Sequence, residues 1–104
     1  MTRPKLDLEE ETLVKERTRL RHPKQYRVIL LNDDYTTMEF VVSVLEAIFM
    51  KSPAEAVQIM LQVHRQGRGV CGVFTKQIAE AKIELVHQRA REEGHPLRCT
   101  LEEA

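Results

Sequence analysis

The residues of this sequence that are suited to binding a ligand gather in the stretch LLNDDYTTMEF, where Asn32, Asp33 and Asp34 follow two leucines. Farther along the chain, His64 lies four residues after Met60, so a helix would place both side chains on one face. The amide oxygen of Asn32, the carboxylate of Asp33 and the neutral imidazole of His64 are hydrogen-bond acceptors. With apolar side chains beside them, they suit a ligand that has a cationic, multi-donor head and an apolar body. A peptide amino terminus with a large hydrophobic first residue is such a ligand, because its ammonium group has three donors.

The same side chains also have purely structural uses. Asn and Asp often close turns and cap helices, and the polar trio directly precedes a predicted helix. His64 would then be a histidine at the edge of the core, with one nitrogen satisfied. Likewise, Met38, Val41 and Val42 recur at helical spacing, which is typical of a stripe that faces the core. The residues alone leave both interpretations open.

Two other classes of site would use some of the same residues. An enzyme with a thiolate nucleophile would need Cys71 and would use His64 as its base, but Cys71 lies in an apolar run, where burial raises a thiol pKa. A metal site would take Asn32, Asp33, Asp34 and His64 as mixed oxygen and nitrogen ligands. Consecutive residues of one turn rarely converge on one ion, and the sequence has no EF-hand or Cys/His zinc signature. We therefore expect no catalytic residue, no metal and no cofactor.

The balanced charge argues against partners that attract a protein through a long-range field. The 104 residues contain 16 Lys plus Arg and 16 Asp plus Glu, and the segment HRQGRG has no aromatic residue beside Arg65 and Arg68. Nucleic acids and anionic membranes are therefore not expected partners. No run of about 18 apolar residues is present and the first residues are too charged for a signal peptide, so we expect a cytoplasmic protein. Cys71 and Cys99 lack CxxC spacing, which predicts buried free thiols.

The polar trio lies between a predicted strand and a predicted helix. The segment QYRVILL, residues 25–31, is β-branched and aliphatic and too short for a helix, which predicts a buried strand. Thr36 and Glu39 match a capping box at the start of a helix that continues through FVVSVLEAIFM. The strand would thus end in a turn that faces the amino terminus of this helix.

Two more capping signals organise the middle of the chain. Ser52 and Glu55 match a second capping box, and the helix that it starts is expected to end at Gly67. The segment VCGVFT, residues 70–75, has strand character, with a bulge expected at Gly72. The short connection between the first two helices predicts a helical hairpin.

The remaining elements complete one small domain over residues 23–104. Thr75 is a suitable cap for a third helix that ends near Gly94, and PLRCTLE, residues 96–102, alternates like a final strand. The order strand, helix, helix, strand, helix, strand predicts an α+β fold in which three helices pack on one three-stranded antiparallel sheet. Residues 1–22 are charged and poor in apolar side chains, so we expect a flexible amino-terminal extension.

Four segments of the sequence resemble the bacterial ClpS family: YRVILLNDDYTTMEFVVSVL, IMLQVHRQGRGVCGVFT, IAEAK and HPLRCTLE. The resemblance covers about residues 24–103, which is nearly all of the predicted domain. It implies a small α/β adaptor, expected to be a monomer, that delivers N-end rule substrates to the ClpA unfoldase of the ClpAP protease. The implied ligands are N-degron peptides and proteins that begin with Leu, Phe, Tyr or Trp.

The resemblance also implies roles for single residues. Asn32, Asp33 and His64 match the residues that hold the α-ammonium group, while Asp34 is assigned to the turn. Met38 matches the gatekeeper at the neck of the hydrophobic pocket. The residues that match the pocket lining are Leu30, Thr36, Met38, Val41, Met60, Val63 and Leu97.

Two positions depart from the family pattern. Thr37 stands where the family often has proline, which predicts a differently shaped pocket neck beside Met38. Gln77 stands where some members have a glutamate on the surface that docks on the unfoldase's N-terminal domain, although Glu80 and Lys82 of that surface are retained. A weaker docking contact, or docking on a related partner, is expected. In the family, the flexible extension is engaged by the unfoldase during substrate handover, and residues 1–22 match it by position.

Overall fold

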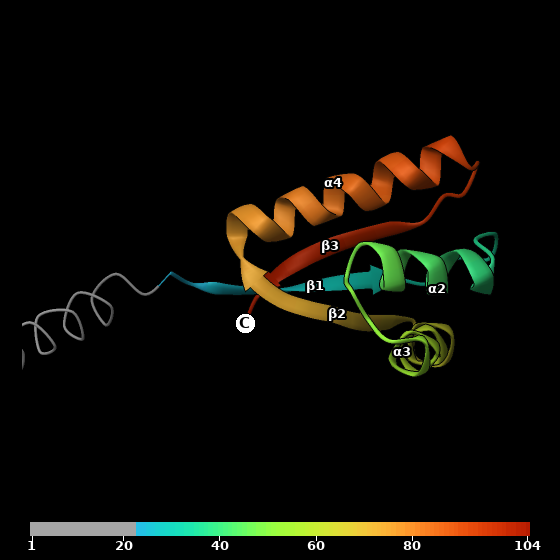
Figure 1. Ribbon diagram of the computed structural model, residues 1–104, viewed down its shortest axis with the longest axis horizontal. Helices are drawn as coiled ribbons and strands as arrows, with labels where there is room; N and C mark the ends of the chain where they lie inside the picture. The colour runs from blue at the N-terminus through green and yellow to red at the C-terminus, as the bar shows by residue number, and fades with distance from the viewer. Residues whose placement is uncertain (1–22) are drawn as a thin grey trace, which may run out of the picture.

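A three-stranded sheet and three helices make up residues 23–104, the part of the chain that the structure, a computed structural model, describes (Figure 1). The strands are β1 (Gln25–Leu31), β2 (Arg68–Thr75) and β3 (Arg98–Glu103). They lie in the order β2-β1-β3, and β1 pairs antiparallel with both neighbours. The helices are α2 (Met38–Ala47), α3 (Pro53–Gln66) and α4 (Lys76–Glu92). The predicted α+β class and the order β-α-α-β-α-β are confirmed, whereas the predicted extension, residues 1–22, lies outside the described residues.

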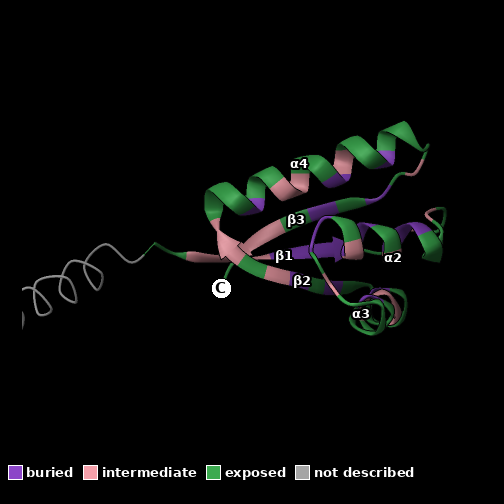
Figure 2. Cartoon of the chain, viewed as in Figure 1, coloured by how far each residue is buried: buried purple, intermediate pink, exposed green. Residues whose placement is uncertain are grey.

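Three consecutive residues of β1, Val28, Ile29 and Leu30, are buried, and the two faces of the sheet differ in what covers them (Figure 2). Val28 and Leu30 are fully buried and share one core cluster with apolar residues of α2, α3 and α4. On the opposite face, Leu31, Val70 and Val73 remain partly exposed to solvent. All three helices therefore cover one face of the sheet, and the other face is open.

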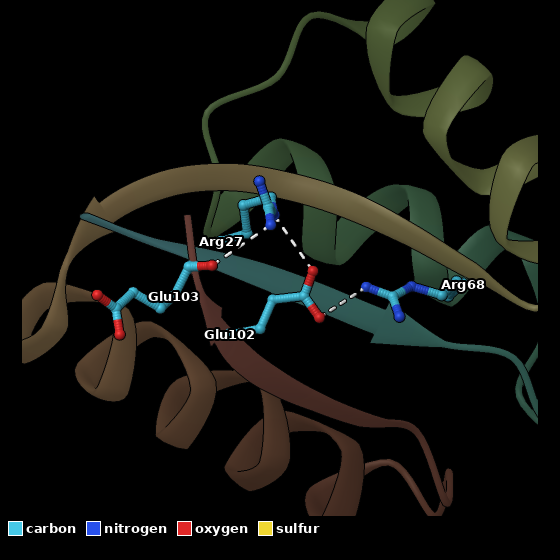
Figure 3. Close-up of polar contacts among 4 residues, drawn as sticks. All are labelled: Arg27, Arg68, Glu102 and Glu103. Carbon is cyan, nitrogen blue, oxygen red and sulfur yellow. Dashed lines mark hydrogen bonds and ion pairs between the residues drawn. The ribbon is translucent and has the colours of Figure 1, made fainter. Parts of the chain in front are cut away.

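An ion-pair cluster joins the three strands on this open face (Figure 3). Glu102 of β3 accepts a hydrogen bond from Arg27 Nε of β1 at 3.2 Å and lies 2.9 Å from Arg68 Nη2 of β2. Along β1, Ile29 lies between Arg27, which is paired with Glu102, and Leu31, which is paired with Arg68. Ile29 is only 1% exposed although no helix covers it. We attribute its burial to the aliphatic stems of the long side chains in this cluster.

The contact between α3 and β2 depends on two glycines. The predicted capping box at Ser52 and Glu55 starts α3, and Gly67 ends it with a left-handed φ of 88° and a hydrogen bond from its N–H to Val63 O. A Cβ atom on Gly69 would lie 2.7 Å from Cγ2 of Val63, closer than van der Waals contact allows. Gly69 thus permits β2 to lie directly against α3.

The start of α2 differs from the prediction by one residue. The N-cap is Thr37, whose hydroxyl accepts a hydrogen bond from the N–H of Phe40 at 3.1 Å. Thr36, which the sequence pairs with Glu39 in a capping box, instead donates its hydroxyl to Asp33 at 2.7 Å. Thr37 has a φ of −72°, which proline also adopts. The departure from the family pattern therefore changes how the helix is capped but does not require a new path of the chain.

The strands differ from the prediction in small details. The bulge in β2 lies at Cys71, one residue before the predicted Gly72, because Cys71 has no register partner in β1. β3 begins at Arg98, two residues later than predicted, which fits the inability of Pro96 to donate a ladder hydrogen bond. Cys71 and Cys99 are buried free thiols, as predicted.

Candidate functional site

A cavity of about 210 Å³ lies where β1 ends, between the following turn and helices α2 and α3. Its lining residues are Asn32, Asp33, Asp34, Thr36, Met38, Val41, Met60, Val63 and His64. The fold thus brings the predicted ammonium-binding residues together with most of the predicted pocket residues. Leu30 and Leu97 are the exceptions: they are 0% and 2% exposed and are not among the residues that line the cavity.

The carboxylate of Asp33 holds the turn after β1, although the sequence assigns this role to Asp34. Asp33 Oδ1 accepts hydrogen bonds from the N–H groups of Tyr35, at 2.8 Å, and Thr36, at 2.7 Å. Asp33 Oδ2 accepts one from the Thr36 hydroxyl, also at 2.7 Å. A carboxylate has about four lone-pair sites, so about one is left, on Oδ2. Asp33 therefore closes the turn and still has capacity for one further donor.

These hydrogen bonds also keep Asp33 ionised. Burial raises the pKa of the Asp33 carboxyl, but the hydrogen bonds from Thr36 and Tyr35 and the nearby His95 together lower it by more. The pKa consequently lies below its usual range, and the group carries a full negative charge at neutral pH. A charged acceptor is what an ammonium group requires.

A backbone hydrogen bond connects Asn32 to the end of α3. The N–H of Asn32 donates to Gly67 O at 3.0 Å, and His64 lies in the last turn of α3, three residues before Gly67. This bond holds the turn and His64 on facing sides of the cavity. The side chains of Asn32 and His64 are exposed and form no hydrogen bond with any other residue of the 23–104 range. Their acceptor atoms are therefore available to a ligand.

Apolar side chains from α2 and α3 form the rest of the cavity wall. Val41 and Val63 are 7% and 3% exposed, and Met60 is half-buried. Met38, the first residue of α2, is 43% exposed and so lies at the mouth. One side of the cavity thus presents hydrogen-bond acceptors, and the other presents aliphatic and thioether groups.

A larger cavity, of about 530 Å³, lies between α4 and β3, away from the predicted site. Its lining contains charges of both signs, including Glu80 and Arg91. It also contains His87, a residue that the sequence did not single out, whose Nε2 accepts a hydrogen bond from the N–H of Cys99 at 3.1 Å. Burial and the cationic neighbours Arg98 and Arg91 lower the pKa of His87. This imidazole is thus already engaged within the fold, in contrast to that of His64.

The geometry also bears on the alternative classes of site. Cys71 is 1% exposed, and burial raises its thiol pKa to about 12, so a thiolate there is strongly disfavoured at neutral pH. Within residues 23–104, no group of three or more His, Cys, Asp or Glu side chains is arranged to hold a metal ion. No helix in that range is long and apolar enough to cross a membrane.

The three predicted docking residues lie on α4 but do not form one patch. Gln77 and Glu80 are exposed. Lys82 is half-buried, donates a hydrogen bond to Ile48 O at 2.8 Å and lies over the rings of Phe49 and Phe74. Each residue of an α-helix is rotated by about 100° from the one before, so Lys82 projects about 200° around the helix axis from Glu80. The two residues therefore lie on opposite flanks of the buried stripe of α4.

Comparisons with known proteins agree on one family. The family model described as "ATP-dependent Clp protease adaptor protein ClpS" matches residues 21–100. The ATP-dependent Clp protease adapter protein ClpS of Nitratidesulfovibrio vulgaris is 62% identical over 84 residues, which cover 81% of this chain and 84% of that protein. The protein of the same name from Oleidesulfovibrio alaskensis is 52% identical over 103 residues, which cover 99% of each chain.

A solved structure is similar as well. Agrobacterium tumefaciens ClpS2 bound to L-phenylalaninamide superposes with a TM-score of 0.76 and 43% sequence identity, over 79% of this chain and 99% of that one. The segment that the family model matches, residues 21–100, includes the whole cavity at the end of β1 and both elements that supply its acceptors. This chain therefore belongs to the ClpS family of ATP-dependent Clp protease adaptor proteins.

Proposed function

We propose that this chain is an adaptor that binds proteins whose first residue is Leu, Phe, Tyr or Trp and delivers them to the ClpA unfoldase of the ClpAP protease. The observation that carries the proposal is the cavity at the end of β1, in which free acceptors lie beside an apolar wall. The related ClpS2 structure supports it, because L-phenylalaninamide combines a free α-amino group with an aromatic side chain.

The α-ammonium group of the substrate has three donors, and the cavity offers three acceptors of different kinds. Asn32 supplies an amide oxygen, His64 a neutral ring nitrogen and Asp33 the remaining lone pair of Oδ2. Asp33 also supplies the negative charge, which makes its bond to the ammonium shorter and stronger than a neutral hydrogen bond. The polar end of the cavity thus selects a free, charged amino terminus.

The first side chain of the substrate would lie against Met38, Val41, Met60 and Val63. Burying a Leu or Phe side chain contributes about 1.5–3 kcal/mol, and each hydrogen bond to a charged group contributes about 1.5–3 kcal/mol. Two or three such bonds together with this burial reach about 8 kcal/mol, which corresponds to micromolar affinity before ordering costs. Affinity of this size suits an adaptor that must release its substrate.

Delivery requires contacts outside the cavity. Gln77 and Glu80 are exposed on α4 and are the proposed contacts for the N-terminal domain of the unfoldase. Lys82 is engaged with Ile48, so its contribution to docking would be to shape the surface near Phe74 rather than to present a free charge. In this proposal the adaptor acts as a cytoplasmic monomer, and residues 1–22 are the segment that the unfoldase engages.

Peptides that differ only at their amino terminus test the binding step. Acetylation of a Phe-initiated peptide removes the charge and two donors, so we expect a loss of about 2–3 kcal/mol in binding, measured by fluorescence anisotropy. The loss is expected near the size of the charged hydrogen bonds because Asp33 keeps its three bonds within the turn.

A Ser-initiated peptide of otherwise identical sequence is the matched control, since it keeps the ammonium but lacks the apolar side chain. It should also bind weakly. If the acetylated peptide bound as tightly as the free one, the cavity would not be an ammonium site.

A further inference from the structure

We propose that Thr36 is a positioning residue for recognition of the ammonium group: it fixes the Asp33 carboxylate so that one lone pair of Oδ2 faces the ligand. The proposal rests on the proposed function of the cavity. It gives Thr36 a role in head-group recognition that acts through Asp33, in addition to its place on the cavity wall.

The two contacts of Thr36 reach both oxygens of the same carboxylate. Its N–H donates to Oδ1 and its hydroxyl donates to Oδ2, each at 2.7 Å, while the N–H of Tyr35 adds a third bond at 2.8 Å. The χ2 torsion of an aspartate is otherwise broad and roughly two-fold. Donors on both oxygens select one orientation of the carboxylate, and the hydroxyl is the one side-chain donor among the three.

The Thr36 hydroxyl does not cap the helix that follows. Thr37 is the N-cap of α2 and accepts the hydrogen bond from Phe40 N–H. The two adjacent threonines therefore divide two tasks, since one caps the helix and the other holds Asp33. Removing the Thr36 hydroxyl leaves the cap intact, so its loss should act on the carboxylate rather than on the fold.

Several charged or titratable groups face Asp33 from the elements around it. Asp34 is its neighbour in the turn, His64 lies across the cavity on α3, and His95 approaches from the segment between α4 and β3. The His95 ring stacks on Phe40 with ring centroids 4.3 Å apart. If the Asp33 carboxylate were free to rotate, a protonated imidazole of His64 or His95 would attract it. The bonds from Thr36 keep the carboxylate available to the substrate instead.

The test compares Thr36→Val, which replaces the hydroxyl with a methyl of similar size, with Thr36→Ser, which keeps it. We expect Thr36→Val to lower the affinity for a Phe-initiated peptide about tenfold, equivalent to ~1.4 kcal/mol. Thr36→Ser should restore most of that loss. A Leu-initiated peptide should lose affinity by the same factor, because the effect concerns the shared head group.

A double-mutant cycle with Asp33→Asn separates positioning from direct contact. If Thr36 acts through Asp33, then Thr36→Val should cause no further loss in the Asp33→Asn background. A loss that persists there, or that differs between Phe- and Leu-initiated peptides, would overturn the proposal and make Thr36 a pocket-wall residue alone. Should Thr36→Val fold poorly by circular dichroism, Thr36→Ala provides the same comparison.

A carbon-detected NMR titration of the Asp33 carboxyl is independent of any peptide. The midpoint should rise in Thr36→Val and stay near the wild-type value in Thr36→Ser, because a hydrogen bond to the ionised form has been lost or kept. An unchanged midpoint in Thr36→Val would contradict the link between the two residues. Equal binding of acetylated and free peptides to the wild type would instead contradict the proposed function, so the two failures are distinguishable.

Discussion

Two cavities of this protein each contain a histidine, and they differ in what that histidine already binds. At the end of β1, His64 is exposed and its ring has no partner among the described residues. Between α4 and β3, His87 accepts a hydrogen bond from the N–H of Cys99, an outward-facing group of the edge strand β3. In the smaller cavity the histidine is free to accept a hydrogen bond from a ligand, whereas in the larger one it already accepts a hydrogen bond from the backbone of β3.

Volume alone would favour the larger cavity, whereas the state of the histidine favours the smaller one. The larger cavity exceeds the smaller one by more than a factor of two, at about 530 against 210 Å³. The imidazole of His87, however, already accepts a hydrogen bond from the backbone N–H of Cys99. In the smaller cavity the backbone is satisfied by Asp33 and Gly67, so the side chains of Asn32 and His64 stay available.

Removing His64 should have the largest effect on binding. We expect His64→Ala to weaken binding of a Phe-initiated peptide by about 1.5–3 kcal/mol, because an acceptor for the charged ammonium is lost. Calorimetric titrations of both proteins with the same peptide at neutral pH measure this effect.

The matched control is His87→Ala, which removes the other histidine and leaves the smaller cavity intact. It should change peptide affinity little. If His87→Ala weakened binding as much as His64→Ala did, the distinction between the two cavities would be wrong.

Replacing Met38 should change selectivity by a smaller amount. Side chains branched at Cβ, such as Ile and Val, carry a methyl close to the peptide backbone, where Met38 lies at the mouth of the cavity. Ile and Leu bury similar apolar area, so exclusion of Ile must come from steric conflict. Met38→Ala should therefore improve binding of Ile- and Val-initiated peptides by about 1–3 kcal/mol, with less effect on Phe.

Affinities for Leu-, Ile- and Val-initiated peptides, measured with wild type and with Met38→Ala, provide the test. A wild type that already accepts Ile as well as Leu would show that Met38 does not select. The same conclusion follows if the alanine variant still rejects Ile.

Replacing His87 should change stability rather than binding, and by the least. We expect His87→Ala to lower the free energy of unfolding by about 1 kcal/mol, because Cys99 N–H loses its acceptor. The pKa of His87 is lower in the fold than its ordinary value of 6.5, so the unfolded chain takes up a proton at higher pH than the folded protein does. The stability contributed by neutral His87 is thus complete above about pH 6.5 and is lost as the pH falls toward the folded pKa.

Urea unfolding of both proteins at several pH values between 8 and 5 measures this contribution. The difference in stability between wild type and His87→Ala should shrink on acidification. A difference that stays constant would mean that His87 is not the titrating group.

Local sequence signals predict those parts of the fold that local interactions decide. The bounds of β1 follow from an aliphatic run closed by the polar trio, and α3 follows from the capping box at Ser52 and the glycine at position 67. The start of α2 was wrong by one residue because adjacent threonines fit the same cap equally well. Thr36 donates its hydroxyl to Asp33, which leaves Thr37 to cap the helix. The hydrogen bond to Asp33 is visible only in the folded turn.

Features that depend on tertiary placement were not predictable in this way. Leu30 matches a pocket position in the family pattern, yet packing from three helices leaves it 0% exposed. A lysine is expected on the surface from its type alone, but the ammonium group of Lys82 donates a hydrogen bond to Ile48 O at 2.8 Å. The ion-pair cluster around Glu102 requires the register of all three strands.

The hydrogen bond from Asn32 N–H to Gly67 O makes hydrogen exchange at the Asn32 amide a probe of the binding site. A protected amide exchanges its proton with solvent only during the moments when its hydrogen bond opens. This bond joins the two halves of the recognition site, so a separation of the turn from the end of α3 would open it. A substrate ammonium held by Asn32 on one half and His64 on the other would bridge the same gap. Slower proton exchange at this one backbone amide in the presence of substrate would therefore record how far the substrate holds the two halves together.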